Sequence, residues 1–225
     1  MLLILIGMLA APARPDSLAS VSSPRIALSI PDTAIAYGVQ AVILPVYLDN
    51  PIDTIAGCEF HVVIDDNPYI RFAQGKANET GVTRMVDTSG TIVAGWEWMG
   101  VNYDKTRPND LKVALLADWP NEAITPPLMP QKGGLLARLG FEVDEAFAIG
   151  NNRVNIRIVT DKTGFSDIRG YSIGVVTSLE RECVKYVGDS CQVWKTERIG
   201  RLDTTAVHLS SGSITASGDD GSGGD

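Results

Sequence analysis

The segment Gly57-Cys58-Glu59-Phe60-His61-Val62-Val63-Ile64 decides the fold, because apolar and polar side chains alternate along it. A period of two is typical of a β-strand that buries one face. The inward set is Cys58, Phe60, Val62 and Ile64, and the outward set is Glu59, His61 and Val63. The turn-forming run Asp65–Pro68 then ends the strand.

The same alternation recurs in four other segments on either side of this one. Their expected inward residues are Val42, Leu44, Val46 and Leu48; Leu111, Val113, Leu115 and Ala117; Leu135, Ala137, Leu139, Phe141 and Val143; and Val154, Ile156 and Ile158. Pro45 lacks an N–H, so its strand should lie at a sheet edge or carry a bulge. Strands with one buried face must cover one another, which predicts an all-β, two-sheet antiparallel sandwich of about nine strands.

The composition of the chain agrees with a single β-rich domain. Hydrophobic residues make up 44% of the 225 residues, enough to fill one core, and the 22 Gly and 12 Pro argue against long helices. The formal net charge is −8, with no cluster of basic residues. Because phosphate backbones and anionic lipids attract Lys and Arg, we expect no nucleic-acid partner and no binding to an anionic membrane surface.

The two ends of the chain differ from its body. Leu2–Ala11 is an apolar run as long as the core of an export signal and too short to span a bilayer, although no basic residue precedes it. We therefore expect residues 1–20 to be a signal peptide and linker, and the protein to be secreted with no membrane insertion after removal of the signal. Residues 24–216 should form the sandwich. Residues 217–225 contain only Ser, Gly and Asp and should form a flexible tail.

Four segments carry a resemblance to a known family. They are Ala36–Asn50, which ends in Pro45-Val46-x-Leu48-x-Asn50; Ile55–Phe72, with its Asp/Pro turn; the long strand Gly134–Val143; and Ser211–Thr215. In this order the chain resembles the cohesin domain of cellulosome scaffoldins and related cell-surface proteins, a jelly roll shared with several cellulose-binding modules. The closing strand of that family returns beside the first one.

The resemblance implies a function and a partner. Cohesins are non-catalytic modules in which a flat sheet face receives the helices of a dockerin, within an extracellular or cell-surface assembly that degrades polysaccharides. The expected partner-binding face consists of the outward residues Glu59, His61, Val63, Arg138 and Glu142. The chain departs from the family by an insertion, Arg181–Trp194, before the last strand.

The insertion holds two of the three cysteines, Cys183 and Cys191. Export permits a disulfide, and closing so short a loop would contribute about 2–3 kcal/mol. Cys58 falls on the inward face and should be a buried free thiol. The histidines, His61 and His208, lie far from these cysteines in sequence, and no zinc spacing occurs, so we expect no metal or cofactor.

Catalytic constellations are weak in this sequence. No Gly-x-Ser-x-Gly motif occurs, and Cys58 would lack a basic partner in an apolar interior. Asp65 and Asp66 are neighbours on a Pro turn, where they are more often turn formers than a glycosidase pair. We therefore expect no enzyme.

Two further functions stay open. Direct carbohydrate binding needs exposed flat rings, for which Tyr103 and Trp119 are candidates. Trp96 and Trp98 share the phase of Ile92 and Ala94, which favours core packing. A structural surface or filament subunit is the other possibility, because open sheet edges can accept a strand from a neighbour.

Overall fold

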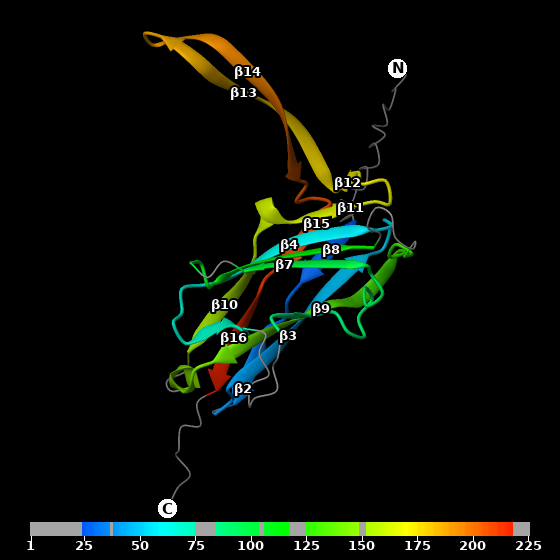
Figure 1. The fold of residues 1–225 in the computed structure, drawn as a ribbon, viewed down its shortest axis with the longest axis vertical. Coiled ribbons are helices and arrows are strands. Elements are labelled where there is room, and N and C mark those ends of the chain that lie inside the picture. The colour runs from blue at the N-terminus through cyan, green and yellow to red at the C-terminus, as the bar shows by residue number, and fades with distance from the viewer. Residues whose placement is uncertain are drawn as a thin grey trace, which may run out of the picture.

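The computed structural model describes residues 24–36, 38–74, 84–103, 106–117, 125–148 and 152–217. These residues form two sheets packed face to face and a separate two-stranded arm (Figure 1). The predicted signal segment and residues 218–225 of the predicted tail lie outside them. Ser217 itself is the last residue of a strand, and its hydroxyl donates to the Ile35 carbonyl at 3.0 Å. The described helices are two short 3-10 turns, and no described helix is long and apolar enough to cross a membrane.

The first sheet has six strands and contains the long central pair of the fold. Its order is β15 (Val207–Ser210), β1 (Ile26–Ser29), β3 (Ala41–Asn50), β9 (Gln131–Val143) and β5 (Ile70–Phe72), with β6 (Val86–Asp87) also beside β9. Most of its pairings are antiparallel, but β1 and β15 run parallel, with Ile26 opposite Val207. The turn η1 (Glu145–Ala148) follows β9.

The second sheet has eight strands arranged around β4. One path runs through β12 (Ser172–Ile173), β11 (Gly164–Ser166), β4 (Gly57–Ile64), β10 (Arg153–Ile158), β16 (Gly212–Ser217) and β2 (Thr33–Ala36). On its other side β4 pairs with β8 (Asp110–Leu116), which pairs with β7 (Trp98–Tyr103). The turn η2 (Thr160–Lys162) lies between β10 and β11. The closing strand β16 runs parallel to β2, so the last strands return beside the first ones, as the resemblance implies.

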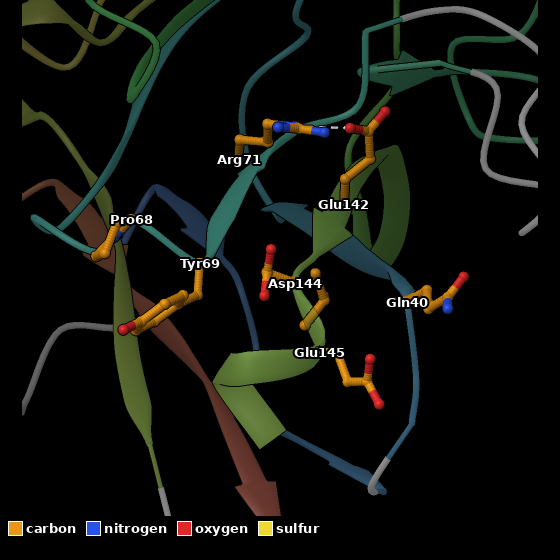
Figure 2. A pocket seen from close by; sticks show the side chains of 8 residues that line it. Gln40, Pro68, Tyr69, Arg71, Glu142, Asp144 and Glu145 are labelled. Atoms are coloured by element: carbon orange, nitrogen blue, oxygen red, sulfur yellow. Dashed lines mark hydrogen bonds and ion pairs between the residues drawn. The ribbon is translucent and has the colours of Figure 1, made fainter. Parts of the chain in front are cut away.

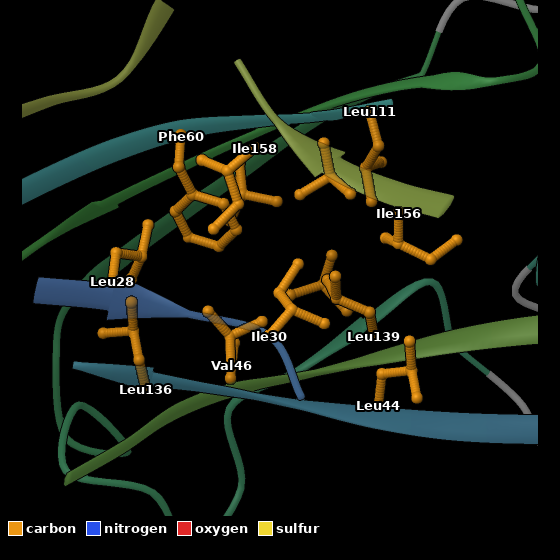
Figure 3. Close-up of a cluster of buried hydrophobic side chains, with 14 of the residues drawn as sticks. Leu28, Ile30, Leu44, Val46, Phe60, Leu111, Leu136, Leu139, Ile156 and Ile158 are labelled. Atoms are coloured by element: carbon orange, nitrogen blue, oxygen red, sulfur yellow. The ribbon is translucent and has the colours of Figure 1, made fainter. Parts of the chain in front are cut away.

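The core lies between the two sheets and confirms the predicted alternation. The inward residues of β3, β4, β8 and β10 are all buried. Figure 3 shows Phe60, Leu111, Ile156 and Ile158 of the second sheet facing Leu44, Val46 and Leu139 of the first. The predicted sandwich is therefore correct, and it holds more than nine strands because its edges are built of short pieces such as β5, β6, β11 and β12.

One predicted inward residue, Leu135, is wrong. The pairing of β3 with β9 shifts after Val46, which lies opposite Ala137, while Tyr47 lies opposite Leu135. The extra residue, Leu136, is fully buried and takes the inward position, and Leu135 is only half-buried. The bulged strand is β9, not the strand β3 that contains Pro45, and β3 lies inside the sheet between β1 and β9. The prediction that the strand of Pro45 lies at an edge or carries a bulge is therefore wrong, although the irregularity of its partner lies close to Pro45.

The predicted inward phase of Trp98 is also wrong. The residues before β7 form turns instead of a strand, so the period of two does not extend through them. Val93 is the buried residue of these turns, and Ala94 is exposed. Trp96 packs half-buried against the core, as expected, whereas Trp98 lies on the outer side of β7 with 36% of its surface exposed.

The predicted insertion is a long hairpin, longer than Arg181–Trp194. It consists of β13 (Val175–Val187) and β14 (Ser190–Leu202), which we call the arm. The predicted disulfide between Cys183 and Cys191 is present, with a Cα–Cα distance of 5.8 Å. Figure 1 shows the arm extending away from the sandwich, beyond β11 and β12.

Candidate partner-binding face

The five predicted partner-binding residues do not form one face. Glu59, His61 and Val63 lie on β4 in the second sheet, whereas Arg138 and Glu142 lie on β9 in the first. Outward side chains of two stacked sheets point in opposite directions. The prediction of a single face is therefore corrected: phase along a strand identifies an outward residue but does not say which sheet carries it.

The outer face of β7, β8, β4 and β10, which we call the β4 face, is covered by charge pairs. Lys112 Nζ lies 2.6 Å from Glu59 Oε1 across the β4–β8 pairing. Arg157 Nε lies 2.6 Å from Asp65 Oδ1, and Asn155 donates to the other carboxylate oxygen of Asp65 at 2.9 Å. The bonds from Asn155 and Arg157 lower the pKa of Asp65. Asp65 is thus held as an anion by β10, which is a structural role.

His61 lies in the middle of this face, and its side chain is only 13% exposed. Its Nδ1 lies 3.6 Å from Asp110 Oδ1, too far for a hydrogen bond, and is buried without a hydrogen-bond partner among the described residues. Desolvation lowers the pKa of His61; Lys162 and Lys112 act in the same direction, and Asp110 and Glu59 oppose them. The imidazole is therefore neutral near pH 7.

An apolar hollow of ≈ 350 Å³ lies at one end of the β4 face. Its walls include the Trp98 ring, Leu116 and Val175, and small residues line the space between them: Gly57, Ala114, Gly164, Ser166 and Ser172. Two glycines leave room for the side chains around the hollow. A Cβ on Gly57 would come within 2.3 Å of Ser166 Oγ, and one on Gly100 would come within 2.2 Å of the Trp98 ring. We call this feature the Trp98 hollow.

Trp98 lies over Gly100, two residues along the same strand. The six-membered part of its ring occupies the space that a side chain at Gly100 would fill. The indole is thus laid along the sheet beside the hollow while part of it stays exposed. This residue was not recognised from the sequence as part of a site, although the spacing Trp98-x-Gly100 on one side of a strand is a signal that could have indicated it.

The remaining two predicted residues lie near the edge of the other sheet. Arg138 donates to the Ser89 carbonyl at 2.7 Å and lies 3.8 Å from Asp87. Glu142 accepts from Arg71 at 2.7 Å and borders a hollow of ≈ 370 Å³. Figure 2 shows Asp144 and Glu145 on the same hollow, with the Arg71–Glu142 pair across its rim. Through these contacts, both predicted residues connect β9 to neighbouring segments.

The candidate carbohydrate residues do not form an exposed aromatic platform in the described residues. Tyr103 is half-buried, and its ring meets Phe72 edge-on with centroids 6.5 Å apart. Its hydroxyl accepts a hydrogen bond from Gln74 Nε2 at 2.9 Å. Trp119 lies outside the described residues. Tyr103 therefore serves as packing at the edge of the core.

The described residues place no metal-binding cluster on the β4 face. No group of three or more His, Cys, Asp or Glu among them is placed to hold a metal ion. Cys58 lies beside the Trp98 hollow as a buried free thiol, as predicted, and burial raises its pKa. A thiol held in its neutral form is a poor nucleophile.

Comparison with known proteins gives the fold a name. The seventh ScaB type I cohesin of Pseudobacteroides cellulosolvens is 16% identical, covers 90% of this chain and 99% of its own, and has a TM-score of 0.50. The type III cohesin of the cellulosomal ScaE cell-surface anchoring scaffoldin of Ruminococcus flavefaciens is 14% identical, covers 93% and 98%, and has a TM-score of 0.50. No family model and no curated protein matches the chain. The chain therefore has the cohesin fold.

Proposed function

We propose that this protein is a secreted, non-catalytic recognition module that binds a dockerin-like protein partner through the β4 face. The observation that carries the proposal is the Trp98 hollow at the end of a sheet face covered by charge pairs. The assembly it would serve is an extracellular or cell-surface one that degrades polysaccharides, as the resemblance to scaffoldin cohesins implies.

The β4 face has the composition expected of a protein-binding surface. Stable interfaces combine an apolar centre, often with an aromatic anchor, and a polar rim that fixes orientation. Trp98 and Leu116 supply the apolar part, and the Lys112–Glu59 pair lies beside it. Because both charges of that pair are partly exposed, a partner can meet them without leaving a buried charge unpaired.

The form of the face favours a flat contact over a small-molecule site. The Trp98 hollow is open to the surface and floored by the strands β4, β8 and β11, whereas small ligands are usually enclosed in deep clefts. A helix laid across the strands could place an apolar side chain in the hollow and polar ones on the rim. This is the binding mode that the resemblance implies for a dockerin.

The test is a binding measurement between the mature domain and a panel of dockerin modules, by pull-down followed by calorimetry. Trp98→Ala removes the wall of the hollow and should weaken binding by at least about 30-fold, the loss typical of a buried aromatic anchor. The matched control is Tyr47→Ala. Tyr47 is an aromatic residue of similar exposure, 38% against 36%, but lies on the outer side of the other sheet. This control should bind as the unmodified protein does.

Three results would count against the proposal. The first is no binding to any module of a broad panel while circular dichroism shows an intact β fold. The second is equal loss in Trp98→Ala and Tyr47→Ala, which would point to a general effect of removing a ring. The third is retardation of the domain in cellulose, xylan or chitin gels together with no protein binding, which would favour the carbohydrate alternative.

A further inference from the structure

The arm is a two-stranded sheet that receives little support from the rest of the molecule. No residue of β13 or β14 is fully buried, and among the described strands each pairs only with the other. An isolated two-stranded hairpin is marginally stable in water, because it buries too little apolar surface. The arm nevertheless exposes large apolar side chains, including Val193 at 46% and Trp194 at 53%. Another strand or sheet packed against such a ribbon would therefore stabilise it.

The outer edge of β14 is open and suited to strand pairing. The strand contains no proline, and from Trp194 to Leu202 its pairing with β13 is regular. A long regular edge with unpaired N–H and C=O groups accepts another strand readily. The strand β14 of a second copy is one strand that can pair with this edge.

Symmetry restricts how β14 can pair with a second copy of itself. Two identical antiparallel strands side by side are related by a two-fold axis perpendicular to the sheet. In an antiparallel pair, two residues that lie directly across from each other point their side chains to the same face of the sheet. The axis must therefore pass beside a residue, which then lies across from its own copy, and cannot pass between two residues. Each residue of β14 thus defines one possible register, and the registers can be compared.

With the axis at Thr196, charged residues of β14 lie across from unlike charges of the second copy, and apolar residues lie across from apolar ones. Lys195 lies opposite Glu197 of the second copy, which pairs unlike charges. These two residues already form an ion pair within β14, so the dimer would hold a cluster of two Lys and two Glu with alternating sign. Val193 lies opposite Ile199, which pairs two apolar side chains. By symmetry each of these pairs occurs twice.

The same register gives the exposed indole of Trp194 a partner. Trp194 lies opposite Arg198 of the second copy. It already has the guanidinium carbon of Arg181, in its own arm, 5.9 Å from its ring. The indole would therefore lie between two guanidinium groups, an arrangement that stabilises both cations through the aromatic face.

The registers centred on Lys195, Glu197 and Arg198 lose this complementarity. An axis at Lys195 sets Val193 against Glu197, and an axis at Glu197 sets Val193 against Arg201. An axis at Arg198 places Lys195 opposite Arg201, a pair of like charges. An axis at Ile199 pairs Glu197 with Arg201, but only residues 196–202 overlap, so Val193 and Trp194 gain no partner in the second copy.

Pairing of two copies along the edge of β13 also sets unfavourable residues against each other. An axis at Arg181 pairs Glu180 with Glu182, and an axis at Leu179 pairs Val176 with Glu182. Directly opposite like charges destabilise a sheet. Of these registers, the one centred on Thr196 is the one that pairs Lys195 with Glu197 and also gives Val193 and Trp194 favourable partners.

We propose that the arm is a homodimerisation element in which β14 pairs antiparallel with β14 of a second copy about a two-fold axis at Thr196. The result is a four-stranded sheet in the order β13-β14-β14-β13, with one sandwich at each end. This inference is independent of the partner that the β4 face binds.

The first test is a charge swap measured by sedimentation velocity of the full mature chain over a range of concentrations. Glu197→Lys faces Lys195 of the second copy and should raise the dimer dissociation constant roughly tenfold, because two attractive pairs become repulsive. Lys195→Glu combined with Glu197→Lys restores unlike charges, both within the strand and across the axis, and should restore the dimer. Within its own arm, Glu197→Lys breaks the ion pair with Lys195 but also removes the like-charge pair with Glu180, so the two changes offset each other and the hairpin should stay folded.

The second test fixes the register. Thr196→Cys places two cysteines beside the axis and should give a disulfide-linked dimer in mild oxidant. The matched control is Ser178→Cys, an exposed residue of β13 that faces no copy of itself in the proposed dimer. A monomer at every concentration up to about 100 µM overturns the proposal. A dimer that Glu197→Lys leaves unchanged, or a Thr196→Cys chain that cross-links no faster than Ser178→Cys, also overturns it.

Discussion

The sandwich and the arm are built from the same kind of element but are held in different ways. Strands of the sandwich alternate a buried face with an outer face, as in β10, where Val154, Ile156 and Ile158 are buried. The two strands of the arm are each longer than β10 but bury no residue fully. Strand length therefore does not determine stability here; a second layer does.

The difference teaches where each region obtains its free energy of folding. Apolar area removed from water supplies about 25 cal/mol per Å², and nearly all of it is in the sandwich. The arm has cross-strand pairs, one disulfide and the Arg181–Trp194 contact. We expect the sandwich to unfold as one cooperative unit and the arm to open by itself at lower cost.

Removing a core ring should give the largest contrast. Phe60→Ala deletes a fully buried ring between the two sheets and should lower the free energy of unfolding by about 3–5 kcal/mol. Trp194→Ala removes a larger ring from the arm and should lower it by less than about 1 kcal/mol, because half of that ring is already in water. Urea denaturation followed by circular dichroism measures both. Equal losses would mean that the arm and the sandwich unfold together.

Replacing one glycine in each region by alanine compares how the backbones of the sandwich and of the arm tolerate a side chain. A Cβ on Gly212 would come within 2.5 Å of the Pro31 carbonyl oxygen and 2.6 Å of that of Ile30, so Gly212→Ala must displace backbone and should cost about 2 kcal/mol or more. Gly188 at the arm tip has φ +60 and open space, so Gly188→Ala should cost only about 1 kcal/mol of local strain. Thermal unfolding of both variants tests this, with a lower melting temperature expected for Gly212→Ala alone.

The disulfide should stabilise only the arm. Cys183→Ser combined with Cys191→Ser should change the free energy of unfolding of the sandwich by less than about 1 kcal/mol, since the bridge closes a loop outside the core. Hydrogen exchange should become faster in β13 and β14 and stay unchanged in β3, β4 and β9. If instead the whole protein melts earlier, the arm is coupled to the core more strongly than its contacts indicate.

The smallest expected effect is a dependence on pH at the β4 face. Burial lowers the pKa of His61, so the unfolded chain binds a proton at this residue more readily than the folded protein does. The free energy that this adds to stability is full above the unfolded pKa, about 6.5, and is lost as the pH falls toward the lower folded value. His61→Gln should flatten this part of the curve of stability against pH. If the curves of stability against pH for the unmodified protein and for His61→Gln stay parallel down to pH 5, the lowered pKa of His61 is contradicted.

Much of the sandwich could be predicted because burial imposes a strict alternation. The period of two placed Val62 in β4 and Val113 in β8 on the buried side of their strands. The failures have physical causes. A bulge reverses phase, which displaced Leu135, and a turn ends a period, which misplaced Trp98.

The candidate site was harder to predict than the fold. The outward residues were recognised, but Arg138 and Glu142 lie on the opposite sheet from His61, because sheet membership depends on long-range pairing. The Trp98 hollow depends on Gly57 lying opposite Ser166 across β4 and β11, two strands far apart in sequence. No local pattern contains that contact.

The parallel pairings of β1 with β15 and of β2 with β16 have a mechanical consequence. The chain enters the sandwich beside Ile26, which lies opposite Val207, and leaves it at Ser217, which lies opposite Ala36. A pull on both ends would slide the first strands along the last ones, so the backbone hydrogen bonds of both pairs would be loaded together and not opened one after another. The fold is thus suited to carry tension along its length.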